Sequence, residues 1–267
     1  DGISQATRPE VARYRAEFIA NKFGANAHVL DLTCGLGFDS REFARYGLQV
    51  TAVEIDPEIA EYARHNLNSF DVAVHCADAA EFEIPNNIDV IFVDPARRDP
   101  NAAKDSKGNT KRIFNPAQWS PSWETINQIA KSHPVTAKVA PGIDKAELSN
   151  WDARWISSDG DLVECFLSSS GTGIRSAVLI DSKNNSTIEL KGDAATISAP
   201  LGDYLVVPDP ALIRASALDA VAQLCNGGLV NEHIAWLTTS DADAVLKLSK
   251  HSPSLANILR VESHFKF

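Results

Sequence analysis

Short apolar runs alternate with stretches of helical periodicity through the first half of the chain. Strands that alternate with helices are typical of a parallel sheet covered by helices on both faces. The pattern therefore predicts a doubly wound α/β fold. The predicted strands are residues 28–32, 50–56, 72–76, 88–93 and 135–139, and the predicted helices are residues 9–23, 40–46, 57–67 and 119–129.

The leading helix is amphipathic, and its apolar side is expected to cover the sheet. Its basic residues Arg13, Arg15 and Lys22 are interpreted as a solvated face. After residue 150 the pattern predicts strands at 153–158, 162–168 and 174–181, the last two as an antiparallel pair. A polar stretch follows with one hairpin (187–190 and 195–197), then a helix over 211–225, a short strand near 235–241 and a final element over 254–267.

The first strand ends in a glycine turn that leads into a helix. Gly35 and Gly37 would let a ligand lie against the main chain, and the helix start offers free N–H groups. A dinucleotide site would require G-x-G-x-x-G, but the third position is Ser40. Asp31 would repel a pyrophosphate and suits a cationic amino-acid end, such as that of S-adenosylmethionine (SAM). Ser40 and Asp31 therefore disfavour a NAD-dependent oxidoreductase.

Four acids follow four predicted strands: Asp31, Glu54, Asp78 and Asp94. The carboxyl ends of parallel strands line one crevice, so these side chains are expected to meet there. Glu54 follows Gly37 at a spacing close to the roughly 20 residues at which an acid meets ribose hydroxyls. Asp78 is placed to accept a hydrogen bond from an adenine amino group.

The motifs Asp31-x-x-Cys34-Gly35-x-Gly37 and Glu54-Ile55-Asp56-Pro57 resemble those of class I SAM-dependent methyltransferases. They are more closely similar to trimethylguanosine-synthase-like RNA methyltransferases, over roughly residues 26–182. The resemblance implies a Rossmann-like, mostly parallel, seven-stranded sheet with an antiparallel last strand, and SAM as cofactor. It implies cofactor contacts from Asp31, Thr33, Cys34, Gly35, Gly37, Asp39, Glu54, Ile55, Asp78 and Ala79.

The segment after the fourth strand departs from the family pattern. Base N-methyltransferases carry an acid or Asn, two prolines and an aromatic residue, whereas this chain has Asp94-Pro95-Ala96-Arg97. Asp94, the Pro95 carbonyl and Arg97 are the predicted catalytic residues, with Asp94 orienting the acceptor or taking its proton. The missing aromatic leaves the target atom open.

A basic loop follows directly. Residues 97–112 hold six basic and two acidic residues, a local net charge of +4 in a chain of −10. Lysine and arginine at the methyl-transfer end of the sheet suit contacts with RNA phosphates. The predicted substrate-binding residues are Arg97, Arg98, Lys104, Lys107, Lys111 and Arg112. A solvated insert is the alternative.

The C-terminal part resembles the THUMP-like module of some methyltransferases, through residues 208–214 and Trp236-Leu237-Thr238. That resemblance implies a small α+β accessory domain that handles RNA. Residues 203–267 carry a net charge of −2, so a packing or dimerisation module is the alternative. The predicted domains are an N-terminal helical segment (1–25), a SAM-binding domain (26–185) and the accessory domain (186–267).

Composition narrows the class of protein. The 267 residues are 44% hydrophobic, no apolar run approaches a membrane span, and no secretory signal is apparent. Four dispersed cysteines and scattered histidines show no metal spacing, and a cytoplasmic location is expected. The sequence predicts a SAM-dependent methyltransferase that acts on RNA. The alternatives are a small-molecule or protein acceptor, or a non-catalytic SAM- or RNA-binding protein. Oligomeric state is left undetermined.

Overall fold

The computed structural model describes residues 8–97, 113, 115–169, 171–192 and 194–263. The chain divides into two compact units, which are described one at a time. The first comprises Asp1–Val139 with Leu167–Ser170, and the second comprises Ala140–Phe166 with Gly171–Phe267. This division follows packing alone, so the domain boundaries after residues 25 and 185 stay predictions.

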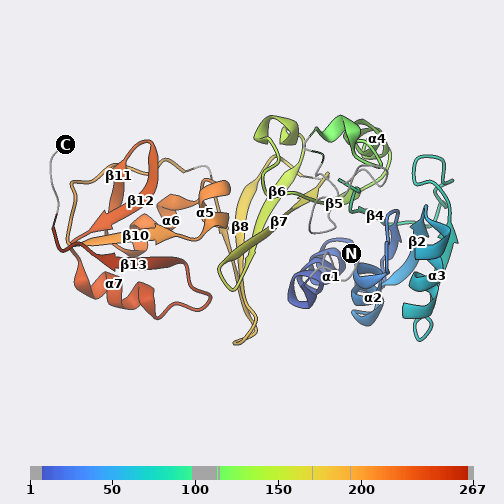
Figure 1. Ribbon diagram of the computed structural model, residues 1–267, viewed down its shortest axis with the longest axis horizontal. Helices are drawn as coiled ribbons and strands as arrows, with labels where there is room; N and C mark the ends of the chain where they lie inside the picture. The colour runs from blue at the N-terminus through green and yellow to red at the C-terminus, as the bar shows by residue number, and fades with distance from the viewer. Residues whose placement is uncertain (1–7, 98–112, 114, 170, 193, 264–267) are drawn as a thin grey trace, which may run out of the picture. The chain divides into compact units, whose positions relative to one another are not determined.

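The first unit has the alternating α/β arrangement that its hydrophobic pattern predicts. Strands β3, β2, β1, β4 and β5 lie in that order, and each neighbouring pair is parallel. Figure 1 shows α1 and α2 on one side of these strands and α4 on the other. The elements are α1 (Pro9–Phe23), β1 (His28–Asp31), α2 (Phe38–Arg45), β2 (Gln49–Glu54), α3 (Pro57–Asn66), β3 (Val72–Cys76), β4 (Val90–Val93), the 3-10 turn η2 (Pro116–Gln118), α4 (Trp123–Ile129) and β5 (Val135–Val139).

The core of this unit lies on β1 and β4, the two central strands. All four residues of β4 are buried, which is typical of a parallel strand covered on both faces. The Phe92 ring packs edge-on against Phe43 of α2, with 5.1 Å between the ring centroids. Because the strand order reverses between β1 and β4, a crevice is expected at the carboxyl ends of these strands.

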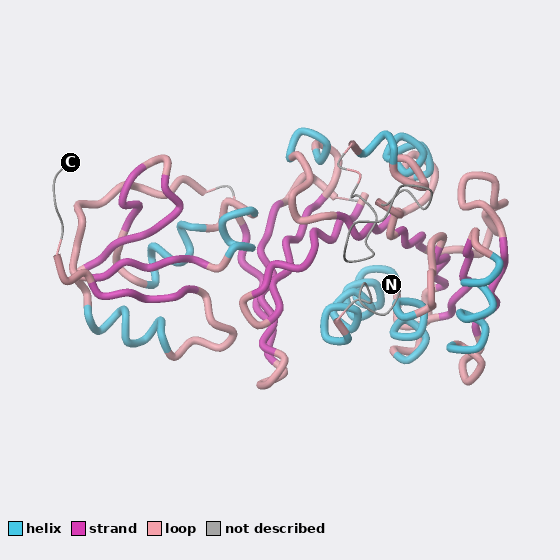
Figure 2. Tube along the Cα trace, viewed as in Figure 1, coloured by secondary structure: helices cyan, strands magenta, loops and turns pink. Residues whose placement is uncertain are grey.

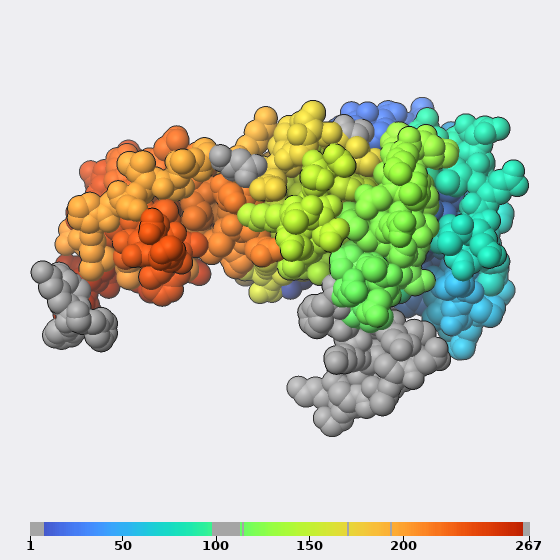
Figure 3. Space-filling model, turned by 90° about the horizontal axis from the view of Figure 1, so that it is seen from above, coloured from blue at the N-terminus to red at the C-terminus, as the bar shows by residue number. Residues whose placement is uncertain are grey.

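The second unit contains a set of paired strands and a separate sheet. Strand β8 pairs in parallel with β6 and antiparallel with β9. Strands β11, β12, β10 and β13 form a four-stranded antiparallel sheet, drawn with its helices in Figure 2 and in orange to red in Figure 3. The elements are η3 (Lys145–Leu148), β6 (Asp152–Ser158), β7 (Asp161–Ser168), β8 (Arg175–Asp181), β9 (Ser186–Lys191), β10 (Tyr204–Pro208), α5 (Pro210–Arg214), α6 (Leu218–Leu224), β11 (Gly228–Asn231), β12 (Ile234–Thr239), α7 (Ala242–Ser249) and β13 (Ala256–Arg260).

The predicted fold class is confirmed: a mostly parallel central sheet and a separate antiparallel sheet. Among the described residues, the central sheet has the strand order β3-β2-β1-β4-β5-β7-β6-β8-β9, which is nine strands rather than the expected seven. The predicted antiparallel pairing of residues 162–168 with 174–181 is wrong, because β7 and β8 are not neighbours. Asp159 and Gly160 both have positive φ, of 53° and 85°, and such a two-residue turn folds β7 back onto β6 instead.

Two further element predictions are corrected by local geometry. Residues 187–190 belong to β9 and pair with β8, whereas residues 195–197 form no strand. The single helix predicted over 211–225 is two helices, because Ser216 adopts a left-handed φ of 58° between α5 and α6. The helix expected within 119–129, with Ser120 or Ser122 as its cap, begins at Trp123 and is capped by Ser122, whereas Ser120 forms a backbone bridge with Ala96.

Arg15 is buried, which contradicts its interpretation as part of a solvated face. Its side chain is 0% exposed and forms an ion pair with Asp39 in the first turn of α2. The guanidinium also lies over the Phe92 ring, 5.5 Å from its centroid. One arginine therefore joins α1, α2 and the central strand β4.

Replacing Arg15 with Met should lower the free energy of unfolding by about 3–5 kcal/mol, because Asp39 would stay buried without its cation. Urea denaturation followed by circular dichroism measures this change. The exposed Arg13 on the same helix is the matched control, and Arg13→Met should change stability by less than about 0.5 kcal/mol. Equal effects of the two substitutions would contradict the assigned role of the ion pair.

Candidate active site

The turn after β1 is fixed to the neighbouring strand by main-chain hydrogen bonds. The Cys34 amide donates to the Val53 carbonyl at 2.9 Å, and the Gly37 amide donates to the Cys34 carbonyl at 2.8 Å. Asn66 at the end of α3 adds a side-chain hydrogen bond to the Leu36 carbonyl at 2.9 Å. The turn is therefore held in one conformation before any ligand binds.

The two glycines of the turn are required for different reasons. Both have positive φ, 53° at Gly35 and 81° at Gly37. A Cβ atom on Gly37 would lie 2.9 Å from Leu67 Cδ1, whereas a Cβ atom on Gly35 would meet nothing within 4 Å. A side chain at Gly37 would require the Leu67 side chain to shift, whereas open space lies beside Gly35.

Glu54, the last residue of β2, joins the glycine turn to the start of α3. Its Oε2 accepts a hydrogen bond from the Gly35 amide, and its Oε1 accepts one from the Asp56 amide, both at 2.9 Å. A carboxylate has about four lone-pair positions, so each oxygen can still accept one hydroxyl. Glu54 is thus pre-oriented to bind a pair of hydroxyl groups.

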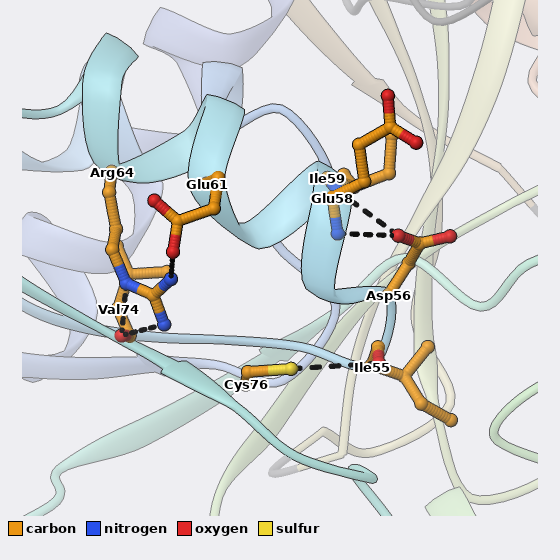
Figure 4. A network of polar contacts seen from close by, with 8 residues as sticks. All are labelled: Ile55, Asp56, Glu58, Ile59, Glu61, Arg64, Val74 and Cys76. Carbon is orange, nitrogen blue, oxygen red and sulfur yellow. Dashed lines mark hydrogen bonds and ion pairs between the residues drawn. The ribbon is translucent and has the colours of Figure 1, made fainter.

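The segment after Glu54 places an apolar side chain at the same edge. Figure 4 shows Asp56 capping α3, with Oδ1 accepting from the amides of Glu58 at 2.8 Å and Ile59 at 3.2 Å. Ile55 precedes this cap and is 57% exposed. A large apolar side chain exposed beside Glu54 suits the flat face of a bound base.

Asp31 at the end of β1 is completely buried. Ser40 donates to its Oδ2 at 2.6 Å, and the Thr33 amide donates to its Oδ1 at 3.2 Å. Burial raises the pKa of Asp31 to about 7, although the hydrogen bond from Ser40 acts in the opposite direction. These contacts give Asp31 a role in shaping the glycine turn, and its direct contact with a cofactor stays a prediction.

Thr33 and Cys34 complete the turn. Thr33 Oγ1 accepts a hydrogen bond from the Asp94 amide at 2.6 Å, which ties the end of β1 to the end of β4. Cys34 is buried, and burial raises the pKa of its thiol, so this cysteine stays protonated. It acts as a small packing residue rather than as a nucleophile.

The remaining predicted cofactor residues lie in different settings. Asp78 is exposed after β3, and its Oδ1 accepts from the Ala80 amide at 2.8 Å, so that Ala79 lies in the turn that follows. The Asp39 carboxylate is paired with Arg15 of α1. This ion pair gives Asp39 a packing role, and its contact with a cofactor stays a prediction.

Backbone hydrogen bonds hold the segment that follows β4. Pro95 is buried, and Ala96 exchanges backbone hydrogen bonds of 2.7 and 3.1 Å with Ser120. The Arg97 carbonyl accepts from the Ile113 amide at 2.8 Å. The other predicted substrate residues, Arg98, Lys104, Lys107, Lys111 and Arg112, lie outside the described residues.

The structure also places Lys138 at this edge, a residue absent from the predicted site. The β4–β5 register pairs Val93 with Ala137, so Asp94 and Lys138 follow as the next opposed positions. Lys138 Nζ lies 2.5 Å from Asp94 Oδ2. The signal in the sequence was a lysine inside an otherwise apolar strand that ends beside the strand carrying Asp94.

Two kinds of feature are absent from the described residues. Within this part of the chain, no group of three or more His, Cys, Asp or Glu side chains is arranged to hold a metal ion. No described helix has the length and apolar character needed to cross a membrane.

Comparison with known proteins identifies the segment that carries this turn. Residues 29–103 match the model of a family described as a methyltransferase domain. A Mycobacterium tuberculosis protein named as an uncharacterized S-adenosylmethionine-dependent methyltransferase is 29% identical over 223 residues, which cover 80% of this chain and 58% of that protein. A ubiquinone biosynthesis O-methyltransferase of Xanthomonas euvesicatoria is 37% identical over 82 residues, 29% of this chain and 34% of that enzyme.

A solved structure shares the fold. The crystal structure of a protein classed as a methyltransferase from Porphyromonas gingivalis W83 aligns with a TM-score of 0.69 at 17% identity, over 98% of this chain and 66% of that one. This chain thus spans about three fifths of the Mycobacterium tuberculosis relative and two thirds of the Porphyromonas gingivalis structure. Residues 29–103 of this chain are therefore similar to a methyltransferase domain, and the shared fold agrees with that similarity.

Neutralising Asp31 should change how stability depends on pH. The pKa of Asp31 is about 7 in the folded protein, against an ordinary value of 3.8. Between these values the folded wild type binds a proton that the unfolded chain releases, so the stability that this proton contributes is lost as pH rises from 4 to 7. Asp31→Asn has no carboxylate to titrate and should not show this loss. The difference in free energy of unfolding, variant minus wild type, should grow over this range by up to about 4 kcal/mol in urea titrations.

The Ser40→Ala variant provides the opposite test. It removes a hydrogen bond that favours the charged carboxylate, so it should destabilise the protein more at pH 8 than at pH 4. Parallel stability curves for wild type and both variants would show that burial does not perturb Asp31.

Proposed function

We propose that this chain is a SAM-dependent methyltransferase with RNA as its acceptor. The main support for a SAM-dependent methyltransferase is the position of Glu54. This residue is hydrogen-bonded to the glycine turn and to the start of α3, within the segment that matches a methyltransferase domain. Along the chain, this arrangement offers in turn an open main-chain surface, a carboxylate suited to hydroxyl groups and an exposed apolar side chain. Those three features fit SAM.

Different residues of the site would contact different parts of the cofactor. Gly35 leaves open space where the methionine end would lie against the main chain. Glu54 would hold the ribose hydroxyls, Ile55 would cover the base, and Asp78 with Ala79 would meet its edge. When bound, SAM supplies a methyl group on a positively charged sulfur.

Asp94 lies where the acceptor must approach. Its amide is fixed by Thr33 and its carboxylate by Lys138, so it is held at the carboxyl end of β4. Asp94 would orient the nucleophilic atom of the acceptor and accept its proton, and the Pro95 carbonyl would accept a second hydrogen bond. Methyl transfer depends mainly on alignment of the two reactants, so a carboxylate held in position is all that the reaction requires of this edge of the sheet.

The proposal of RNA rests on charge and position. The sequence gives residues 97–112 a net charge of +4, and this segment leaves the strand that ends at Asp94. Phosphate contacts from lysine and arginine would bring an RNA to the site without specifying its sequence. The planar guanidinium of Arg97 would stack on a base in place of the missing aromatic residue.

The C-terminal sheet would act as the RNA-handling module. Its antiparallel strands and three helices agree with a small α+β domain, and residues 208–214 carry the THUMP-like resemblance. Asp209 in that motif caps α5 and accepts a hydrogen bond from Ser157 at 2.6 Å. The motif therefore also serves packing, which agrees with the alternative of a structural module.

A small-molecule acceptor is the second candidate. The observation that favours it is the similarity of 82 residues to an enzyme named as a ubiquinone biosynthesis O-methyltransferase. That stretch covers 29% of this chain, and a shared cofactor-binding segment would produce it whatever the acceptor. A protein acceptor and a non-catalytic SAM- or RNA-binding role are the remaining alternatives.

Calorimetric titration with SAM tests the cofactor site. Wild type should bind with micromolar affinity, and Glu54→Gln should weaken binding by roughly 10- to 100-fold, because it loses charged hydrogen bonds to hydroxyl groups. The exposed Glu147, on η3 of the second unit, is the control, and Glu147→Gln should bind as wild type does. Absence of binding by the wild type would contradict the proposed function.

Transfer of labelled methyl groups then tests the acceptor. We expect label from SAM to enter total bacterial RNA and to be released by ribonuclease. Label in a low-molecular-mass or protein fraction alone would contradict the choice of RNA and retain the methyltransferase. SAM binding with no transfer to any fraction would support the non-catalytic alternative.

A further inference from the structure

We propose that Lys138 is a positioning residue for methyl transfer, which holds Asp94 in place and restricts the acceptor to a group that is neutral before transfer. The inference rests on the proposed function. It concerns a residue that neither the motifs nor the comparisons assign to the site.

The geometry of the pair argues against a chance surface contact. Lys138 is the fourth residue of β5, and the three residues before it are buried. Its side chain is 15% exposed and that of Asp94 is 28% exposed. A lysine held this close to a carboxylate, with most of both side chains removed from solvent, has little freedom to leave it.

The strands on both sides make the arrangement rigid. Asp94 and Lys138 continue the parallel register of β4 and β5, while the Asp94 amide donates to Thr33 Oγ1 at the end of β1. Three neighbouring strands therefore fix one carboxylate. Lys138 engages Oδ2, and within the described part of the chain Oδ1 has no hydrogen-bond partner. Oδ1 is the atom available to an acceptor.

The ion pair defines what Asp94 does in the reaction. The lone pair of the acceptor atom forms a bond to the methyl carbon, the bond from that carbon to sulfur breaks, and its electrons stay on sulfur, which becomes a neutral thioether. The proton of the acceptor passes to Asp94 and then to water. Lys138 holds the Asp94 carboxylate in place before the step and directs Oδ1 toward the acceptor.

The same ammonium group selects the kind of acceptor. Because Lys138 offsets the charge of Asp94, a protonated alkylamine, such as the side chain of a protein lysine, gains less attraction here than it would beside an unpaired carboxylate. A hydroxyl group, or an amino group attached to an aromatic base, is neutral at pH 7 and loses nothing by this offset. This class includes the nucleophilic atoms of nucleic acids.

The test compares Lys138→Met with Lys138→Arg in the full chain. SAM affinity by calorimetry should stay within about twofold of wild type for both. The turnover number for labelled methyl transfer to total bacterial RNA should fall roughly 10- to 100-fold in Lys138→Met, with a smaller change in KM, and should recover in part in Lys138→Arg. Recovery by another cation separates positioning from simple packing.

The exposed Lys131 after α4 is the matched control, and Lys131→Met should keep both SAM affinity and turnover. Unchanged turnover in Lys138→Met overturns the proposal, as does a parallel loss of SAM binding and melting temperature that Lys138→Arg fails to restore. Label found in protein lysine side chains overturns the neutral-acceptor part. A wild type that binds SAM and transfers no label overturns the proposed function itself, and the calorimetry tells that failure apart from a failure at Lys138.

Discussion

The hydrogen bonds of the Glu54 carboxylate are the constraint on which the rest of the site depends. One side chain accepts from Gly35 in the turn after β1 and from Asp56 at the start of α3. The pair of bonds closes the corner between two parallel strands without using the lone pairs that a ligand needs. The buried contacts of Asp31 with Ser40 and Thr33 stabilise the same turn from inside. Carboxylates that the protein has already oriented therefore hold the main chain rigid at this corner.

Much of this arrangement could be predicted from local sequence. The period of the apolar residues gives the parallel strands and α1, and the spacing from Asp31 to Gly37 and Glu54 gives the corner. The later strands could not be ordered in this way, because pairing depends on contacts between distant residues. Asp159-Gly160 was the overlooked signal, since this dipeptide favours the tight turn that separates β7 from β8. Ser216 left no comparable signal, because a left-handed serine has no distinctive sequence pattern.

Charged side chains were the least predictable part of the site. Arg15 lies four residues after Val11 and four before Ile19, on the buried face of α1, so its charge and not its spacing led to the interpretation as a solvated residue. It is buried against Asp39 and the Phe92 ring. Lys138 stands out in an apolar strand, yet its partner is set by the register of β4 and β5, which the sequence alone does not give. Burial decides whether a charge is solvated or structural, and burial is a property of the assembled sheet. The partners of both residues therefore came only from the structure.

The contrast between the two turn glycines has a consequence for how such chains diverge. A side chain at position 37 would press on Leu67 inside the protein, so the packing of the fold itself acts on this position. Gly35 faces open space, so the selection acting on it comes from whatever occupies that space. A lineage that abandons its ligand is then free to accept Asn or Asp at position 35, residues that tolerate a left-handed backbone, while position 37 stays subject to its contact with Leu67. Substitutions at position 37 would thus report mainly on the packing of the fold, and substitutions at position 35 mainly on the ligand.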